Sequence, residues 1–209
     1  MGKIVVSSMV SIDGYTEGAG GDVWAMPMDE AFDEHNADRV RAAGHLLFGA
    51  ATYQGIAGFW PQQVDNPEAS PHDRYIAARY AGGIPITVVS DRLTRDDLQV
   101  RAGQTTIVSR ADAHEAVAQL RDADDERDVL IFGSRTLWTD LLAHGLVDEL
   151  HLMIGPRVVA GDHRVFTGVP EADLRLLDVR SWKDSSCVVL RYAVDRPTPR
   201  RGPEGRADD

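Results

Sequence analysis

The segment Val129-Leu-Ile-Phe-Gly-Ser-Arg-Thr-Leu-Trp138 restricts the fold of this chain more than any other. Its first four residues are apolar without alternation, which is the pattern of a short strand buried on both faces. The strand runs into Gly133-Ser134 and then directly into helix-forming residues over 135–144. The segment therefore predicts a strand buried on both faces that leads directly into a helix, as in an α/β fold.

Apolar and β-branched runs recur along the chain and alternate with helix-forming stretches. Helices are predicted over Asp29–Ala43, over one or two turns from Ala50 to Ala57, and after Ser109, which can cap a helix. The stretch from Pro61 to Pro71 is punctuated by proline and predicts a loop. Strands are predicted over residues 4–9, 46–48, 84–90, 105–108, 129–132, 149–154, 174–182 and 186–194. This alternation, ending in a strand pair, predicts a mixed sheet.

The length of 209 residues fits one sizeable domain, which we place at residues 1–195. Residues 196–209 hold three prolines, two glycines and almost no apolar side chains, and they predict a disordered tail. The single cysteine, Cys187, excludes an internal disulfide and a cysteine-cluster metal site. No apolar run approaches the roughly 20 residues of a membrane span, and the first residues lack the apolar stretch of a secretory signal. We therefore expect a cytoplasmic protein without a membrane partner.

Charge and motifs exclude several classes of function. The chain carries 22 basic and 33 acidic residues, a net charge of −11, and it has no basic stripe, so nucleic acid is not expected as a partner. The seven histidines are scattered without an H-E-x-x-H spacing, and no metal site is predicted. A G-x-S-x-G elbow is absent, so a serine hydrolase is not predicted either. A small molecule remains the expected ligand.

Two junctions between a buried strand and a helix are the candidate binding elements. At Gly133-Ser134, glycine allows a ligand to approach the backbone, and the free N–H groups of a helix start attract phosphate. A second junction of this kind is Gly49-Ala-Ala-Thr-Tyr53. Either junction alone is explained by ordinary capping, but two in one sheet favour a nucleotide site at the carboxyl ends of the strands. A G-x-G-x-x-G fingerprint is absent, so a Rossmann site is not supported.

Candidate catalytic residues are carboxylates near these junctions. Asp13 lies in a glycine-rich loop after the first strand, where Asp-Gly is also a favoured turn pair. Asp33 belongs to a group of acids at one helix start, most of which are expected to be solvated; one that faces a cleft can donate a proton, and the sequence leaves open which. Trp24 and Trp60 follow the suspected loops and are candidate walls for a flat heterocycle, although tryptophans are more often core residues.

Five segments, taken in chain order up to about residue 194, resemble the dihydrofolate-reductase-like family that includes the reductase domain of the bifunctional riboflavin-biosynthesis deaminase-reductase. They are Lys3–Gly14 with its Ser-Ile-Asp-Gly loop, His45–Gln54 with the following Phe59-Trp-Pro, Thr87–Ser90, the Ile131–Leu150 segment ending in Leu-Val-Asp-Glu-Leu, and a Pro156…Gly161…Phe166 pattern. The deaminase half is not represented, because H-x-E and P-C-x-x-C are absent. The resemblance implies a three-layer dihydrofolate-reductase-like fold with a mixed, mainly parallel central sheet of about eight strands flanked by helices. It also implies a homodimer and NADPH bound across the strand ends.

The resemblance also implies residue roles. Asp13 and Trp60 would face the substrate, Gly49 and Thr52 would border the cofactor, and Ser90 would lie near the adenosine phosphate. The pyrophosphate would be held by the residues of the Gly133 junction, Gly133, Ser134, Arg135 and Thr136. Ala50 replaces the arginine usual after the strand-end glycine. Recognition of the 2′-phosphate would then pass to Arg92 or Arg110, each just beyond a strand-end serine, and NADH becomes an alternative cofactor.

Three functions follow as hypotheses. The first is an NADPH-dependent reductase of a small pterin-like or pyrimidine-like heterocycle, which acts by hydride transfer from the nicotinamide. The alternative is a catalytically inactive nucleotide- or ligand-binding protein on the same fold. A third is a dimeric structural or interaction module. Binding of NADPH and its oxidation in the presence of candidate substrates separate the three.

Overall fold

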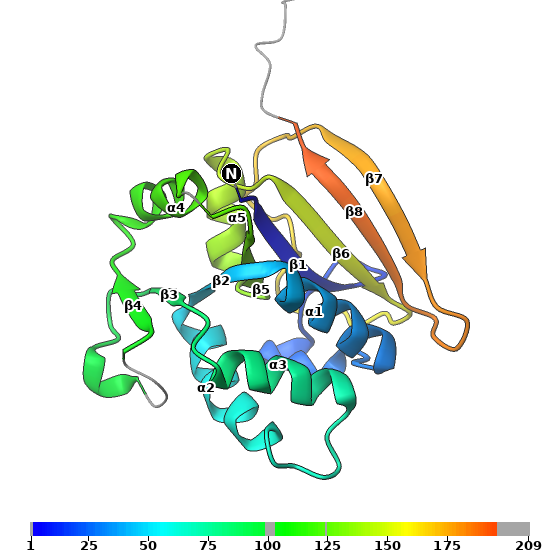
Figure 1. The fold of residues 1–209 in the computed structure, drawn as a ribbon. Coiled ribbons are helices and arrows are strands. Elements are labelled where there is room, and N and C mark those ends of the chain that lie inside the picture. Colours follow the sequence, from blue (N-terminus) through cyan, green and yellow to red (C-terminus); the bar gives the residue numbers. More distant parts are fainter. Residues whose placement is uncertain (1, 99–102, 124, 196–209) are drawn as a thin grey trace, which may run out of the picture.

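The computed structural model describes residues 2–98, 103–123 and 125–195 (Figure 1). The predicted disordered tail, residues 196–209, lies outside the described residues. One eight-stranded sheet forms the centre, with the strand order β4-β3-β2-β5-β1-β6-β8-β7. The strands are β1 (Ile4–Ser11), β2 (Ala43–Gly49), β3 (Ile86–Val89), β4 (Thr105–Val108), β5 (Asp128–Phe132), β6 (Glu149–Gly155), β7 (Leu174–Ser181) and β8 (Val188–Val194).

The sheet is mixed and mainly parallel, as predicted. β4, β3, β2, β5, β1 and β6 pair in parallel along the sheet order, whereas β8 is antiparallel to both of its neighbours, β6 and β7. A parallel pair needs a crossover connection, so helices separate these strands along the chain and cover the sheet. The helices are α1 (Glu30–Ala42), α2 (Ala50–Gln63), α3 (Pro71–Ala81), α4 (Ala113–Asp122) and α5 (Arg135–Ala143).

Two apolar cores lie on opposite faces of the sheet. Side chains alternate along each strand, so Ile4 and Val6 join one core while Val5 joins the other. The first core packs the sheet against α4 and α5, and Trp138 of α5 is fully buried in it. The second core packs the sheet against α1, α2 and α3 (Figure 1). The predicted three-layer arrangement is therefore confirmed.

Three helix predictions need correction. α2 extends to Gln63 and includes Pro61, because Tyr53, Ala57 and Trp60 form one helical face that packs into the second core. The predicted loop from Pro61 to Pro71 is therefore shorter than expected, because its first residues belong to α2. A helix that was not predicted, α3, follows it. α3 begins at Pro71, and the Oγ atom of Ser70 accepts the N–H group of Asp73 at 3.0 Å, which is a common helix start.

The helix predicted after Ser109 begins later. Asp112 is the N-cap residue of α4, and Ser109 bonds to it instead of to the helix: its Oγ atom accepts the Asp112 N–H group at 3.2 Å and lies 2.6 Å from the Asp112 carboxylate. Among the described residues, no helix combines the length and the apolar composition that crossing a membrane requires.

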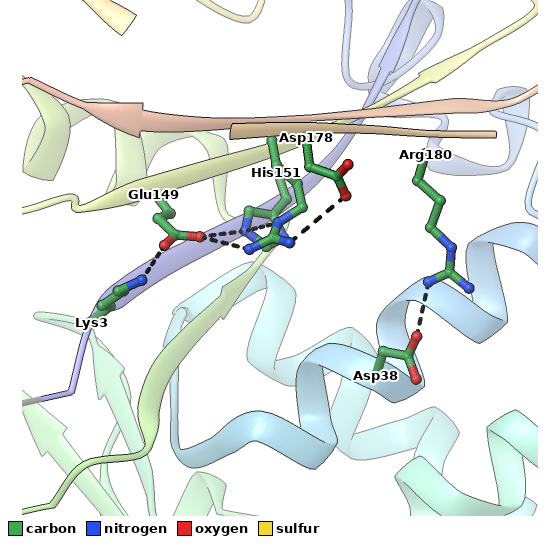
Figure 2. A network of polar contacts seen from close by, with 7 residues as sticks. Lys3, Asp38, Glu149, His151, Asp178 and Arg180 are labelled. Atoms are coloured by element: carbon green, nitrogen blue, oxygen red, sulfur yellow. Dashed lines mark hydrogen bonds and ion pairs between the residues drawn. The ribbon is translucent and has the colours of Figure 1, made fainter. Parts of the chain in front are cut away.

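Part of the space between α1 and the sheet is polar (Figure 2). Glu149 and His151 of β6 are buried, and the Glu149 carboxylate lies 3.0 Å from Nε2 of His151 and 3.4 Å from Nη2 of Arg191 on β8. Lys3 also donates to this carboxylate. Hydrogen bonds from His151 and Lys3 lower the pKa of Glu149 to about 2. Burial lowers the pKa of His151.

His35 of α1 faces this group, with ring centroids 5.6 Å from His151. It is 3% exposed, and burial together with the positive charges nearby lowers its pKa to about 3. At the outer end of α1, Arg180 of β7 donates to the carboxylates of Asp38 and Glu34. These ion pairs link the helix to β7, which is the last strand of the sheet among the described residues.

We expect the protein to lose stability as the pH is lowered from 7 to 4. The folded-state pKa values of His35, His151 and Glu149 are all depressed, so the unfolded chain binds more protons on acidification and the stability present near neutral pH is lost. Each excess proton costs up to about 1.4 kcal/mol per pH unit. Asp33 acts in the opposite direction: its raised pKa means that the folded protein takes up this one proton before the unfolded chain does, which offsets part of the loss of stability.

Urea unfolding at pH 7, 6, 5 and 4 measures this dependence. The His35→Gln variant should reduce the slope between pH 7 and 5, because one titrating group is removed. A free energy of unfolding that stays constant over this range in the unmodified protein would contradict the expectation.

Candidate functional site

The six parallel strands end at the same edge of the sheet, and this edge brings most of the predicted site residues together. In sheet order, Ser90 follows β3, Gly49 ends β2, Gly133 follows β5 and Asp13 follows β1. Gly49 and Gly133, which are 84 positions apart in the sequence, thus begin neighbouring turns because β2 pairs with β5. Ligands of open α/β sheets gather at such an edge.

The two strand–helix junctions contact each other through hydrogen bonds. The backbone N–H group of Gly49 donates to Oγ of Ser134 at 3.0 Å, and the N–H group of Ser134 donates to Oγ1 of Thr52 at 3.2 Å. The chain between β5 and α5 takes two consecutive left-handed residues, Gly133 at φ 50° and Ser134 at φ 49°. This conformation favours glycine and is uncommon for serine, so the junction holds a strained turn.

Two helix N-termini meet at these junctions without side-chain caps. α1 and α3 are capped by Asp29 and Ser70, whereas neither α2 nor α5 has a side-chain hydrogen bond at its N-cap residue. The first N–H groups of a helix have no partner inside the helix, and the helix dipole adds partial positive charge there. α2 and α5 together therefore present an anion-binding edge next to Gly49 and Gly133.

Further along the edge, Ser90 holds a turn. Its buried Oγ atom accepts the N–H groups of Arg92 at 3.1 Å and Leu93 at 3.0 Å. Arg110, the other arginine after a strand-end serine, is engaged with Asp91. Its backbone N–H group donates to Oδ1 at 2.8 Å, and its Nε atom lies 3.6 Å from Oδ2. Arg92 and Arg135 are in no ion pair with a described residue and remain available to an anionic ligand.

Asp13 connects two loops. Its carboxylate accepts the N–H groups of Val159 at 3.2 Å and Ala160 at 2.9 Å, and its carbonyl accepts from Arg164. Hydrogen bonds from the Ser11 side chain and these backbone groups lower the pKa of Asp13 to about 2. Asp13 is therefore ionised near neutral pH and positions the loop after β6; its predicted catalytic role stays a prediction.

Asp33 has the opposite properties. It lies in the first turn of α1, partly buried, with Oγ of Ser70 at 3.5 Å. Burial and the nearby Asp73 carboxylate raise the pKa of Asp33 to about 6. A carboxyl group with this pKa holds a proton in part of the molecules near neutral pH, as a general acid requires. The neighbouring Glu34 is bound to Arg180 instead.

The two predicted tryptophans differ in their surroundings. Trp24 is 71% exposed and lies in the middle of a short 3-10 turn, Val23–Ala25, that Asp22 caps. Trp60 lies inside α2 rather than after a loop; it packs against the second core and makes an edge contact with Phe59 at 4.9 Å. Trp24 has the exposure of a side chain that can cover a ligand, while Trp60 is mainly structural.

Two surface hollows lie away from these residues. One, of about 350 Å³, is lined by residues 93–95 and 105–107; the other, of about 210 Å³, is apolar and includes Leu142, Phe166 and Leu174. Neither is lined by a predicted site residue.

A mixed eight-stranded sheet between two helix layers, with uncapped helix starts at its carboxyl edge, defines an α/β protein of the dihydrofolate-reductase-like fold. The sequence profile of the family described as RibD C-terminal domain matches residues 2–190, and the chain belongs to this family. The family resemblance of the sequence is thereby confirmed. No curated protein matches the sequence.

Solved structures share the fold at low sequence identity. A putative riboflavin biosynthesis protein from Shewanella sp. PV-4 has 17% identity and a TM-score of 0.64, covering 93% of this chain and 99% of that one. A pyrimidine reductase-like protein from Corynebacterium diphtheriae has 18% identity and a TM-score of 0.61, covering 94% and 93%. A dihydrofolate reductase from Enterococcus faecalis, solved with NADP(H), has 14% identity and a TM-score of 0.55, covering 93% and 97%.

Proposed function

We propose that this protein is a reductase that uses NADPH to reduce a small pterin-like or pyrimidine-like heterocycle. The observation that carries the proposal is the pair of uncapped helix starts joined through Gly49, Thr52 and Ser134. Membership of the RibD C-terminal domain family supports it, as do the names of two structural neighbours, a pyrimidine reductase-like protein and a dihydrofolate reductase.

The residues at the edge suit a dinucleotide. Backbone N–H groups at Arg135 and Thr136 would bind the pyrophosphate, and the Arg135 guanidinium would add a charge-assisted bond. Gly133 has no side chain to obstruct close approach to the backbone; a Cβ atom there would be in ordinary contact with Cγ2 of Thr52, at 3.7 Å. When bound, NADPH supplies the hydride. Gly49 and Thr52 would border it, and Ser90 with Arg92 would lie toward the adenosine.

Asp33 supplies the proton in this proposal. Its raised pKa keeps a proton available at the start of α1, while Asp13 holds the facing loops and Trp24 covers the heterocycle. Protonation of the substrate nitrogen makes the adjacent carbon more electrophilic and so favours hydride transfer. The alternative function is a binding protein without turnover on the same fold.

Fluorescence titration with NADPH, followed by oxidation assays with a panel of dihydropterins and aminopyrimidinones, tests the proposal. We expect binding and substrate-dependent oxidation. Binding without oxidation across the panel would favour the inactive binding protein, and absence of binding would reject both.

Cofactor preference should be weak. Position 50 is alanine, and the net charge of −11 gives no general attraction for a 2′-phosphate, so NADPH and NADH should bind within about tenfold of each other. Ala50→Arg should then tighten NADPH over NADH by about ten- to a hundredfold, the value of one charge-assisted bond. If Arg92 already binds the phosphate, Arg92→Ala removes the preference. Strong selectivity that is insensitive to Arg92→Ala would refute this account.

A homodimer is the proposed assembly, with a second copy covering the outer face of β7 and β8. Leu190 of β8 pairs with Leu152, a residue of the first core, and with Val179, so this apolar face continues outward to β7. Leu176 and Val179 are 52% and 53% exposed there, and the apolar hollow at Leu174 adjoins them. A face of this kind favours a covering partner.

Light scattering should give about 46 kDa at micromolar concentration, twice the 22.9 kDa of one chain. The double variant Leu176→Lys with Val179→Lys should shift the mass toward the monomer, because two buried lysines would be unpaired in the interface. A mass near 23 kDa for the unmodified protein would reject the dimer.

A further inference from the structure

Two helices on one face of the sheet bring together two histidines and a carboxylate that are far apart in the sequence. His114 lies in the first turn of α4, Asp140 lies in the last turn of α5, and His144 is the C-cap residue of α5. Nε2 of His114 is 2.6 Å from Oδ2 of Asp140, and Nδ1 of His144 is 3.6 Å from Oδ1. The two imidazole rings lie 3.9 Å apart.

We propose that His114, Asp140 and His144 form a binding site for Zn²⁺. One ligand atom from each residue lies within 4.8 Å of the others. Two imidazoles and one carboxylate, with water in the fourth position, are a donor set that zinc accepts. Metal–ligand bonds of about 2.0–2.1 Å in a tetrahedron place two donor atoms about 3.3 Å apart. Nε2 of His114 and Oδ2 of Asp140, at 2.6 Å, would have to move apart by less than about 1 Å to hold an ion between them.

The surroundings of His144 and Asp140 favour a cation. Nδ1 of His144 lies 2.8 Å from the backbone carbonyl of Asp140, and a metal-binding histidine commonly donates its other nitrogen to such a group, which leaves Nε2 for the metal. A carboxylate in the last turn of a helix is unfavourable next to the negative end of the dipole. A divalent cation compensates both Asp140 and the helix end.

The side chains can adjust to an ion. His114, Asp140 and His144 are 39%, 49% and 51% exposed, so small rotations meet no packed core. No metal site was expected from the sequence, because His114 lies on a different helix from Asp140 and His144. The four-residue spacing of Asp140 and His144 on one helix face was the available signal.

A bound ion would connect α4 to α5. The N-terminus of α5 belongs to the candidate cofactor site, and nine residues at about 1.5 Å each separate it from the ion by about 13 Å. The ion would therefore stabilise the helix pair without contacting the substrate, and the inference is independent of the proposed reductase activity.

The test uses the full chain without a polyhistidine tag. Zn²⁺ affinity and stoichiometry are measured by competition with a chromophoric chelator, and Co²⁺ is added as a spectroscopic probe. We expect one ion per chain, visible-region absorption typical of a tetrahedral Co²⁺ site, and a melting temperature about 5–10 °C higher at a hundredfold excess over Kd.

His114→Ala and His144→Ala should each weaken Zn²⁺ binding by at least about tenfold. His163→Ala is the matched control, because His163 is also exposed and its Nδ1 atom lies 3.6 Å from the Glu17 carboxylate. This variant should bind Zn²⁺ as the unmodified protein does. Circular dichroism verifies that each variant is folded. Equal weakening in the control, no effect of either substitution, or less than one ion per chain would overturn the proposal.

Discussion

Gly133→Val should abolish NADPH binding in a protein that still folds. Gly133 has φ 50°, and a branched side chain in the left-handed region costs about 1–2 kcal/mol, which reduces stability without removing the core contacts. The larger effect is on binding, because the side chain would stand where the pyrophosphate must approach the backbone. We expect the affinity for NADPH to fall by at least about a hundredfold, measured by fluorescence titration, since several phosphate bonds are lost together.

Gly145→Val is the matched control for this substitution. Gly145 also has a positive φ of 67°, and it follows the opposite end of α5, where a Cβ atom would meet nothing within 4 Å. The two variants should lose similar stability in urea unfolding, but only Gly133→Val should lose NADPH. Equal affinities in the two folded variants would remove the pyrophosphate from the Gly133 turn.

Asp33→Asn should lower turnover by about a hundred- to ten-thousandfold while NADPH binding stays unchanged. Proton transfer from a positioned acid contributes about this factor, and asparagine keeps the size of the side chain but holds no acidic proton. In the unmodified protein, turnover should fall as the pH rises through about 6, because the protonated form of Asp33 is the active one. The variant should lose this pH dependence.

Glu30→Gln provides the control, since Glu30 is an exposed acid in the same helix turn. Asp13→Asn separates the two candidate acids. At pH 7 a carboxyl group with a pKa of about 2 is almost never protonated, so Asp13→Asn should raise KM through the displaced loop and leave the pH profile in place. Unchanged turnover in Asp33→Asn, together with loss of the profile in Asp13→Asn, would reverse the assignment.

The sequence predicted the architecture because the buried strands are continuous apolar runs. Val129–Phe132 indicated a strand buried on both faces, and the family resemblance indicated the helix layers, whereas the order of the strands was not predicted. The errors lie where packing outweighs local signals: Pro61 continues α2 because Trp60 packs against the core. The start of α3 was readable from Ser70 and Pro71, but the expected loop obscured it.

The site was predicted in part. Strand-end glycines mark neighbouring turns, so Gly49 and Gly133 could be found from their junctions. The bond between Ser134 and Gly49, the raised pKa of Asp33 and the cluster around His114 depend on contacts between distant segments. No local pattern encodes such contacts, because each arises only when the sheet aligns the segments.

Hydrogen bonds, several of them to Asp13, fasten the loops after β1 and β6 to each other. The Asp13 carboxylate accepts the N–H groups of Val159 and Ala160, and the N–H group of Ile12 donates to the Arg157 carbonyl at 2.9 Å. A Cβ atom on Gly161 would lie 2.1 Å from the Glu17 carbonyl, so the two backbones touch. A redesign of this edge of the sheet must therefore exchange both loops together, because a graft of either loop alone would remove the hydrogen bonds that hold the other.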